Sequence, residues 1–125
     1  MPRVAKTRAG GRWSEARWWS FLRSGLRRMS VRWPVKYDVL RDARRKSRSE
    51  NKRLKWEFRC AQCGGWFAAK AVAVDHIVPV GTLRAFADLP GFVERLFCEA
   101  AGYQVVCTNC HAAKTAAERD VGCDA

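Results

Sequence analysis

The stretches CAQC at residues 60–63 and CTNCH at residues 107–111 decide how this chain folds. Each contains two cysteines separated by two residues, a spacing that lets both thiolates reach one ion from a single turn. The pattern predicts a closed tetrahedral zinc site whose ligands are Cys60, Cys63, Cys107 and Cys110. Such a site leaves no coordination position for water, so its role is structural. It would join two segments that are far apart in the sequence and would stabilise a domain with a small core.

Disulfide bonds are the alternative for these four cysteines. The N-terminus lacks the charged start, apolar run and small-residue cleavage site of a signal peptide. Charges interrupt every apolar run, so we expect no membrane-spanning helix and no membrane partner. We therefore expect an intracellular protein, and in a reducing compartment Cys-x2-Cys pairs bind metal more often than they form disulfides. Cys98 lies in an apolar stretch and is predicted to be a small buried residue, whereas Cys123 is assigned no role.

Positive charge is concentrated in the first half of the chain. The 125 residues, which suit a single domain, carry a net charge of +12. Residues 1–59 hold 19 Lys/Arg against 5 Asp/Glu, whereas residues 60–125 hold 5 against 7. Because one half is strongly basic, we expect a polyanionic partner, namely nucleic acid.

The pattern of apolar residues divides the chain into four segments. We expect a disordered basic tail at 1–12, a basic, Trp-rich helical extension at 13–55, the metal-holding domain at 56–120 and a tail at 121–125. Ser14 is predicted to cap the first helix. A second helix is predicted from about Tyr37 to Lys52. Its basic residues would contact DNA phosphates without recognising the base sequence, and the alternative is that they form only a solvated face. These residues are Arg41, Arg44, Arg45, Lys46 and Arg48. The helical spacing of Trp13, Trp18 and Trp19 favours packing in a core over stacking on bases.

The segment after residue 55 predicts an α+β fold. Trp56 to Phe67 is typical of a hairpin, and short strands are expected at 71–74 and 103–106. Helices are expected at 82–86, at 90–99 and from Thr108 to about Asp120.

Three further residues suggest catalysis. Asp75 and His76 stand together at the end of a predicted strand, so their side chains point to different sides, and one can ligate a metal while the other faces a water. His111 directly follows a zinc ligand at the start of a helix. A carboxylate and an imidazole leave positions open on a divalent ion, and a neutral imidazole suits proton removal from water. The alternatives are that Asp75 caps a turn, that His76 is an ordinary loop residue and that His111 joins the zinc site.

The run VDHIVP at residues 74–79, followed by QVVCTNCHAAKT at residues 104–115, resembles the HNH endonuclease family. The similarity covers about residues 58–117 and is closest to the small zinc-containing HNH proteins of tailed bacteriophages; residues 26–34 resemble the same group more loosely. The resemblance implies a ββα-metal (His-Me finger) core, in which two strands and a helix surround one catalytic ion. It also implies DNA as substrate, the host cytoplasm as location if a phage encodes the chain, and phage terminase or packaging proteins as possible partners.

The resemblance also implies roles for individual residues. Asp75 and His111 match metal ligands, and His76 matches the general base. Thr115 stands where some members carry a further ligand, and Lys114 could contact a phosphate or remain solvated. The catalytic ion would be Mg²⁺ or Mn²⁺, although such a site also accepts Ni²⁺ or Zn²⁺.

Gly102 departs from the family pattern. It stands where the family has an Asn that braces the loop of the base, and its presence predicts weaker orientation of that loop. Three hypotheses therefore stay open: an HNH endonuclease, a non-catalytic zinc module that binds nucleic acid, and a packaging component that cuts only with a partner.

Overall fold

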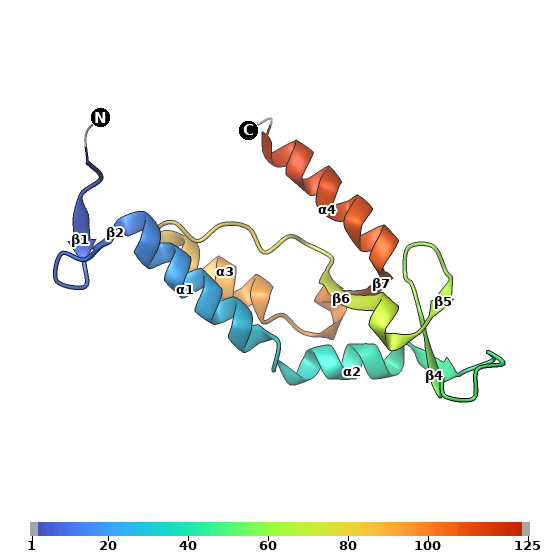
Figure 1. Ribbon diagram of the computed structural model, residues 1–125. Helices are drawn as coiled ribbons and strands as arrows, with labels where there is room; N and C mark the ends of the chain where they lie inside the picture. Colours follow the sequence, from blue (N-terminus) through green and yellow to red (C-terminus); the bar gives the residue numbers. More distant parts are fainter. Residues whose placement is uncertain (1–2, 124–125) are drawn as a thin grey trace. The chain divides into compact units, whose positions relative to one another are not determined.

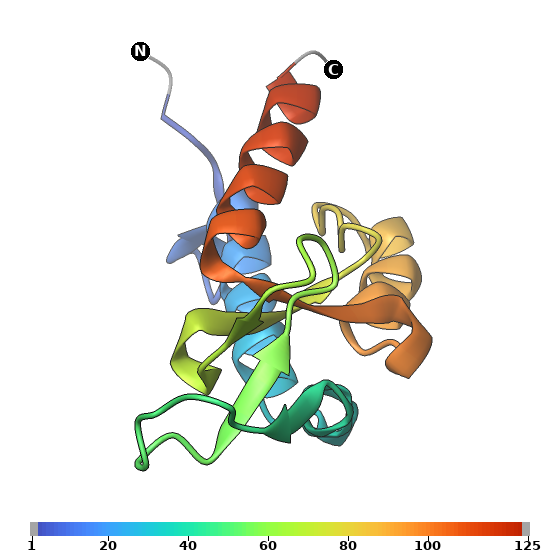
Figure 2. The ribbon, with the colours of Figure 1, turned by 90° about the vertical axis from the view of Figure 1, so that its right-hand side faces the viewer.

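The computed structural model describes residues 3–123, and the side chains of residues 3–118 (Figures 1 and 2). It is a mixed α+β structure with helices and three small sheets. Its contacts divide it into two compact units: the residues up to Trp33 together with Val80–Phe97, and Pro34–Pro79 together with the residues from Cys98 on. Within the described part of the chain, none of the helices combines the length and apolar character that crossing a bilayer requires.

The first unit begins with a two-stranded ribbon and a long helix. β1 (Lys6–Arg8) pairs antiparallel with β2 (Trp13–Ser14), and α1 (Glu15–Ser30) follows directly. Ser14 caps α1 as predicted, since its Oγ accepts a hydrogen bond from the Arg17 backbone N–H at 3.2 Å. Residues 6–8 lie in the segment that we expected to be disordered. They form a strand because the Arg8 guanidinium binds Glu15 at 2.9 Å and lies 3.8 Å from the centre of the Trp18 ring.

The core of the first unit forms between α1 and α3 (Leu89–Leu96), which lie side by side in Figure 1. Its buried members are Trp19, Val80, Leu83, Phe92 and Leu96, with Trp18 packed against them. Trp18 and Trp19 therefore pack in the core, as predicted, whereas Trp13 lies in β2 against Phe21 and outside this core.

The predicted helix at 82–86 is wrong. The structure has only the 3₁₀ turn η2 (Phe86–Asp88), because the Asp88 carboxylate accepts the backbone N–H groups of Arg84 and Ala85 at 3.0 and 3.2 Å. The helix predicted at 90–99 ends earlier, at Leu96.

The second unit begins with α2 (Pro34–Asp42), which is much shorter than the helix predicted to reach Lys52. The chain instead enters a three-stranded antiparallel sheet of β3 (Arg44–Lys46), β4 (Trp56–Arg59) and β5 (Trp66–Phe67). The basic residues thus do not share one helix: Arg41 lies on α2, Arg44, Arg45 and Lys46 lie on β3, and Arg48 follows it. Two of them stack on tryptophans of the sheet, Arg44 on Trp56 at 4.0 Å and Arg45 on Trp66 at 3.7 Å, which stabilises the strand over the helix.

The second sheet of this unit consists of two strands followed by a helix. η1 (Ala69–Ala71) leads into β6 (Val72–His76), and η3 (Ala100–Gly102) leads into β7 (Tyr103–Cys107). The strands are antiparallel, and β7 runs directly into α4 (Thr108–Cys123), as Figure 2 shows. α4 includes residues 121–123, which we expected to be a tail, while residues 124–125 of that tail and the side chain of Cys123 lie outside the described part. The register places Asp75 opposite Gln104 and His76 opposite Tyr103.

Candidate metal centre

The four paired cysteines come together, as their spacing predicted. Their Sγ atoms all lie within 4.8 Å of one another, and those of Cys63 and Cys107 are 4.0 Å apart. In a tetrahedral zinc site with Zn–S bonds of about 2.3 Å, the sulfurs are about 3.8 Å apart. The donor set and its dimensions therefore fit a closed four-thiolate metal site such as a zinc site.

Backbone hydrogen bonds fix the turn that carries the first pair. The Cys60 N–H donates to the Gly65 carbonyl at 2.9 Å, and the Gly64 N–H donates to the Cys60 carbonyl at 2.9 Å. Gly64 has φ +73°, a conformation that favours glycine. The Ala61 N–H donates to the carbonyl of Val105 in β7 at 2.8 Å. The turn is thereby held on the strand that delivers Cys107.

The pKa values of Cys60 and Cys110 are shifted in opposite directions. Burial acts to raise the pKa of Cys60, but the N–H groups of Cys63, Cys107 and Gln62 stabilise its thiolate and lower the pKa to about 6. The pKa of Cys110 is raised to about 12 by its contact with the Cys107 thiol and then by burial. A cation between the four sulfurs would favour the thiolate form of each of them.

Asp75 and His111 lie together beside this cluster. Asp75 Oδ1 is 3.8 Å from His111 Nε2, and the side chains are 14% and 45% exposed. Each atom could reach a shared divalent ion at about 2.1 Å. Gln104 donates to Asp75 Oδ2 at 3.4 Å and accepts a hydrogen bond from Gln62 at 3.0 Å. Gln62 of the cysteine turn thus orients the Asp75 carboxylate through Gln104. The sequence did not point to Gln104, whose role follows from its position opposite Asp75 in the paired strands.

Lys114 places an ammonium group on the same carboxylate. Its Nζ lies 3.0 Å from Asp75 Oδ2, donates to the His76 carbonyl at 2.8 Å and pairs with Glu118. Burial acts to lower the pKa of Lys114, but Glu118 and Asp75 outweigh it and raise the pKa. The lysine is therefore charged and bound to Asp75, which its position in the sequence did not predict.

The His76 imidazole lies against another side chain. Its ring centre is 4.9 Å from that of Tyr103, with the planes tilted by 53°. Because side chains alternate along a strand, it projects from the opposite face of the sheet to Asp75. The structure thus brings Asp75, His111 and Lys114 together, and places the imidazole of His76 on Tyr103. Thr115 is exposed on α4.

Gly102 braces the loop after His76 with its backbone. Its carbonyl accepts the Ile77 N–H at 2.9 Å, and its own N–H donates to the Glu99 carbonyl at 2.9 Å. A Cβ added at Gly102 would lie 2.5 Å from Cys98 Sγ, so a side chain here would require Cys98 to move. The hydrogen bond from the Ile77 N–H therefore braces the loop after His76, although Gly102 lacks the Asn side chain of the family pattern.

Replacing Gly102 with Ala is expected to lower the free energy of unfolding by about 1–3 kcal/mol, because the new methyl group overpacks against Cys98. Urea denaturation would measure the change. Gly25→Ala is the matched control, since Gly25 lies in α1 and an added Cβ there meets nothing within 4 Å. Helix propensity predicts that this control is stabilised by up to about 1 kcal/mol. A Gly102→Ala protein as stable as the wild type would contradict the contact.

The geometry thus combines a four-thiol cluster with a solvent-accessible carboxylate–imidazole pair, and a lysine that competes for the carboxylate. A structural metal suits the first, and a divalent ion with open positions suits the second. The chain matches none of the protein-family models, curated protein sequences or solved structures with which it was compared.

Proposed function

We propose that this protein is a metal-dependent endonuclease of the HNH type, which hydrolyses phosphodiester bonds of DNA. One observation carries the proposal: Asp75 and His111 approach to 3.8 Å where β6, β7 and α4 meet, next to the four cysteines. Two antiparallel strands followed by a helix, with a ligand pair at their junction, is the arrangement expected of a ββα-metal core. The sequence resemblance assigns the metal-binding positions to the same two residues.

The donor set suits a hydrolytic cation. One carboxylate and one imidazole leave several coordination positions for water and for phosphate oxygens, and Mg²⁺ or Mn²⁺ accepts such a set. A divalent ion bound there would act as a Lewis acid and stabilise charge on the leaving 3′ oxygen. Asp75 and His111 would hold the ion, while the four cysteines would hold zinc as a structural element.

The remaining residues would position and deprotonate the reactants. The chain has two histidines, so His76 supplies the imidazole that remains once His111 is a ligand. His76 would act as the general base and take a proton from the attacking water. For this role its side chain must turn away from Tyr103 and toward the face of the sheet that carries Asp75. Lys114 would leave Asp75 and approach a phosphate oxygen. Nonspecific affinity for the DNA backbone would come from the basic residues of α2 and β3 and of the segment after them: Arg41, Arg44, Arg45, Lys46 and Arg48.

The test is cleavage of supercoiled plasmid by zinc-loaded protein with Mn²⁺ or Mg²⁺. The wild type is expected to relax or linearise the plasmid, and His76→Ala is expected to do so at least about 10²-fold more slowly, since a general base contributes that much. Circular dichroism and zinc content serve as folding controls. An inactive wild type, or a folded His76→Ala protein with unchanged activity, would refute the assignment.

The second candidate is a non-catalytic zinc module that binds nucleic acid. The Lys114 ammonium favours it, because a lysine 3.0 Å from Asp75 neutralises the carboxylate without any metal. In that case the wild type and His76→Ala would be equally inactive, while both would still retard DNA in a gel. A link to phage genome packaging rests on the sequence resemblance alone.

Lys114→Met distinguishes the two candidates. If Asp75 is a metal ligand, removing the competing ammonium should tighten Mn²⁺ binding about 5- to 10-fold, the equivalent of an ion pair of about 1 kcal/mol. Isothermal titration of zinc-loaded protein with Mn²⁺ would measure the change. Lys70→Met is the control for the loss of a charge, since Lys70 is exposed on η1. Equal Mn²⁺ affinity in Lys114→Met, Lys70→Met and the wild type would favour the binding module.

A further inference from the structure

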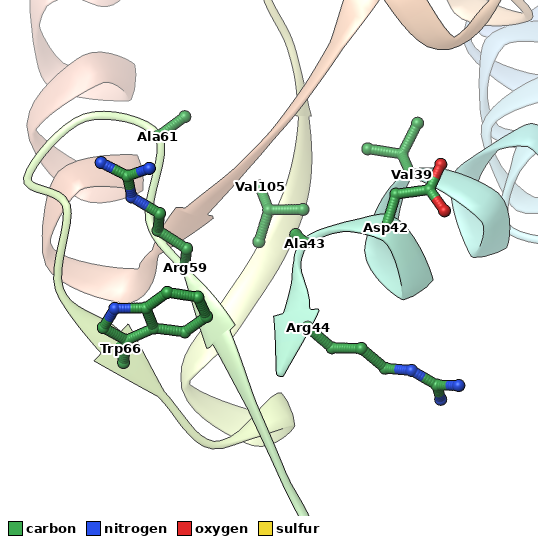
Figure 3. Close-up of a pocket in the computed structure, with 8 residues that line it drawn as sticks. All are labelled: Val39, Asp42, Ala43, Arg44, Arg59, Ala61, Trp66 and Val105. Carbon is green, nitrogen blue, oxygen red and sulfur yellow. The ribbon is translucent and has the colours of Figure 1, made fainter. Parts of the chain in front are cut away.

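The second unit contains a cavity of about 610 Å³ that the proposed nuclease chemistry does not use. Val105 lies near its middle, Trp66 and Arg59 form one side, and Val39 and Asp42 form the other (Figure 3). Arg44 also lines the cavity, with its guanidinium group pointing outward. A volume of this size, with mostly apolar walls and a few polar groups, is typical of a site for a small molecule or for one unit of a polymer.

The backbone around the cavity is fixed by hydrogen bonds between distant segments. The Arg59 N–H donates to the carbonyl of Ala43, just after α2, at 3.0 Å. The Ala61 N–H donates to the carbonyl of Val105 at 2.8 Å. The end of α2, the start of the cysteine turn and β7 therefore keep their spacing, so a ligand would meet a preformed site.

Trp66 is the aromatic wall of the cavity. The Arg45 guanidinium lies over its ring at 3.7 Å from the centre, and Glu57 lies 3.4 Å from Arg45 Nε. The register also pairs Trp66 with Arg59 across β4 and β5. These neighbours hold the indole in one orientation, as a surface for stacking requires.

The charges select an anionic ligand. Arg44 and Arg59 both line the cavity, and residues 34–59 hold 10 Lys/Arg against 4 Asp/Glu. Asp42 adds one carboxylate, which can accept hydrogen bonds from an amino group. A nucleotide meets all three requirements, because it joins a flat ring that stacks, an amino group on that ring and a phosphate that arginine binds.

We propose that this cavity receives one base of single-stranded DNA, stacked on Trp66, with a neighbouring phosphate on Arg59. Bases inside a duplex are already stacked on their neighbours and do not enter a concave site, so the ligand is unpaired. The inference rests on the proposed function only in choosing DNA as the polymer. It adds a second contact, through a base, to the phosphate contacts proposed above.

The experiment compares two strands that differ only in bases. Fluorescence anisotropy would measure binding of a labelled oligodeoxycytidine of about 12 nucleotides, and of the same strand with abasic residues at its centre, to zinc-loaded protein without Mg²⁺ or Mn²⁺. The wild type is expected to bind the strand with all its bases about 5- to 100-fold more tightly, since stacking contributes that much per base. Trp66→Leu is expected to bind both strands equally, and Trp66→Phe to keep part of the preference.

Trp56→Leu is the matched control. Trp56 lies on the same sheet, but the register places it on the opposite face to Trp66, outside the cavity. Its variant should keep the wild-type preference. Equal binding of the two strands by the wild type would overturn the proposal, as would an unchanged preference in folded Trp66→Leu or Trp66→Phe. Because no cleavage occurs under these conditions, the result is independent of whether the plasmid assay detects nuclease activity.

Discussion

Replacing Cys107 with Ser is expected to remove the metal from the four-cysteine cluster and to unfold the second unit. Cys107 is 4% exposed and packs with Cys60 and Val106, so this core and the metal site share residues. Structural zinc sites of this kind contribute about 10–16 kcal/mol of apparent binding free energy, which is comparable to or larger than the whole stability of a typical domain. Zinc content after gel filtration and circular dichroism would measure the two losses.

Cys98→Ser is the control for this substitution. Cys98 lies outside the cluster, so its variant should keep the metal content of the wild type, namely about one zinc ion per chain. A Cys107→Ser protein that retains its zinc and unfolds cooperatively would show that the cluster does not hold the fold together.

Asp75→Asn is expected to reduce DNA cleavage roughly 10³-fold, because a neutral amide replaces the charged ligand and several kcal/mol of transition-state stabilisation are lost. Stability should change little, since an Asn oxygen can still accept the hydrogen bond from Gln104. Initial rates of plasmid nicking at saturating Mn²⁺ would measure the effect.

The control for Asp75→Asn is Asp38→Asn, which also removes one carboxylate. Asp38 is exposed on α2 and pairs with Arg41 at 3.3 Å, so its variant should cleave at the wild-type rate. If Asp75→Asn cleaved as fast as Asp38→Asn, any catalytic ion would have to bind elsewhere.

The parts of the fold that depend on local patterns could be predicted from the sequence. The Cys-x2-Cys pairs indicated a metal cluster, and the sulfurs do converge. Ser14 indicated the start of α1, and the short apolar runs around Asp75 and Val105 indicated β6 and β7. In each case the information lies within a few residues, such as a cap, a ligand spacing or a strand followed by polar residues.

The predictions that were wrong concern segments whose structure depends on contacts with residues far away in the sequence. A helix to Lys52 was consistent with the local composition, but residues 44–46 gain backbone pairing with β4 and the rings of Trp56 and Trp66. Tertiary contacts of this kind outweigh helix propensity. The ion pair between Lys114 and Asp75 likewise joins segments whose spacing is set only by the folded sheet.

Electron paramagnetic resonance of Mn²⁺ added to zinc-loaded protein would show directly whether Asp75 and His111 hold a divalent ion. The wild type is expected to bind one Mn²⁺ ion in addition to its zinc, and Asp75→Asn and His111→Ala are each expected to lose it while keeping the zinc. Two results would contradict this expectation. Either the wild type and Lys114→Met both fail to bind Mn²⁺, or Asp75→Asn and His111→Ala both still bind it.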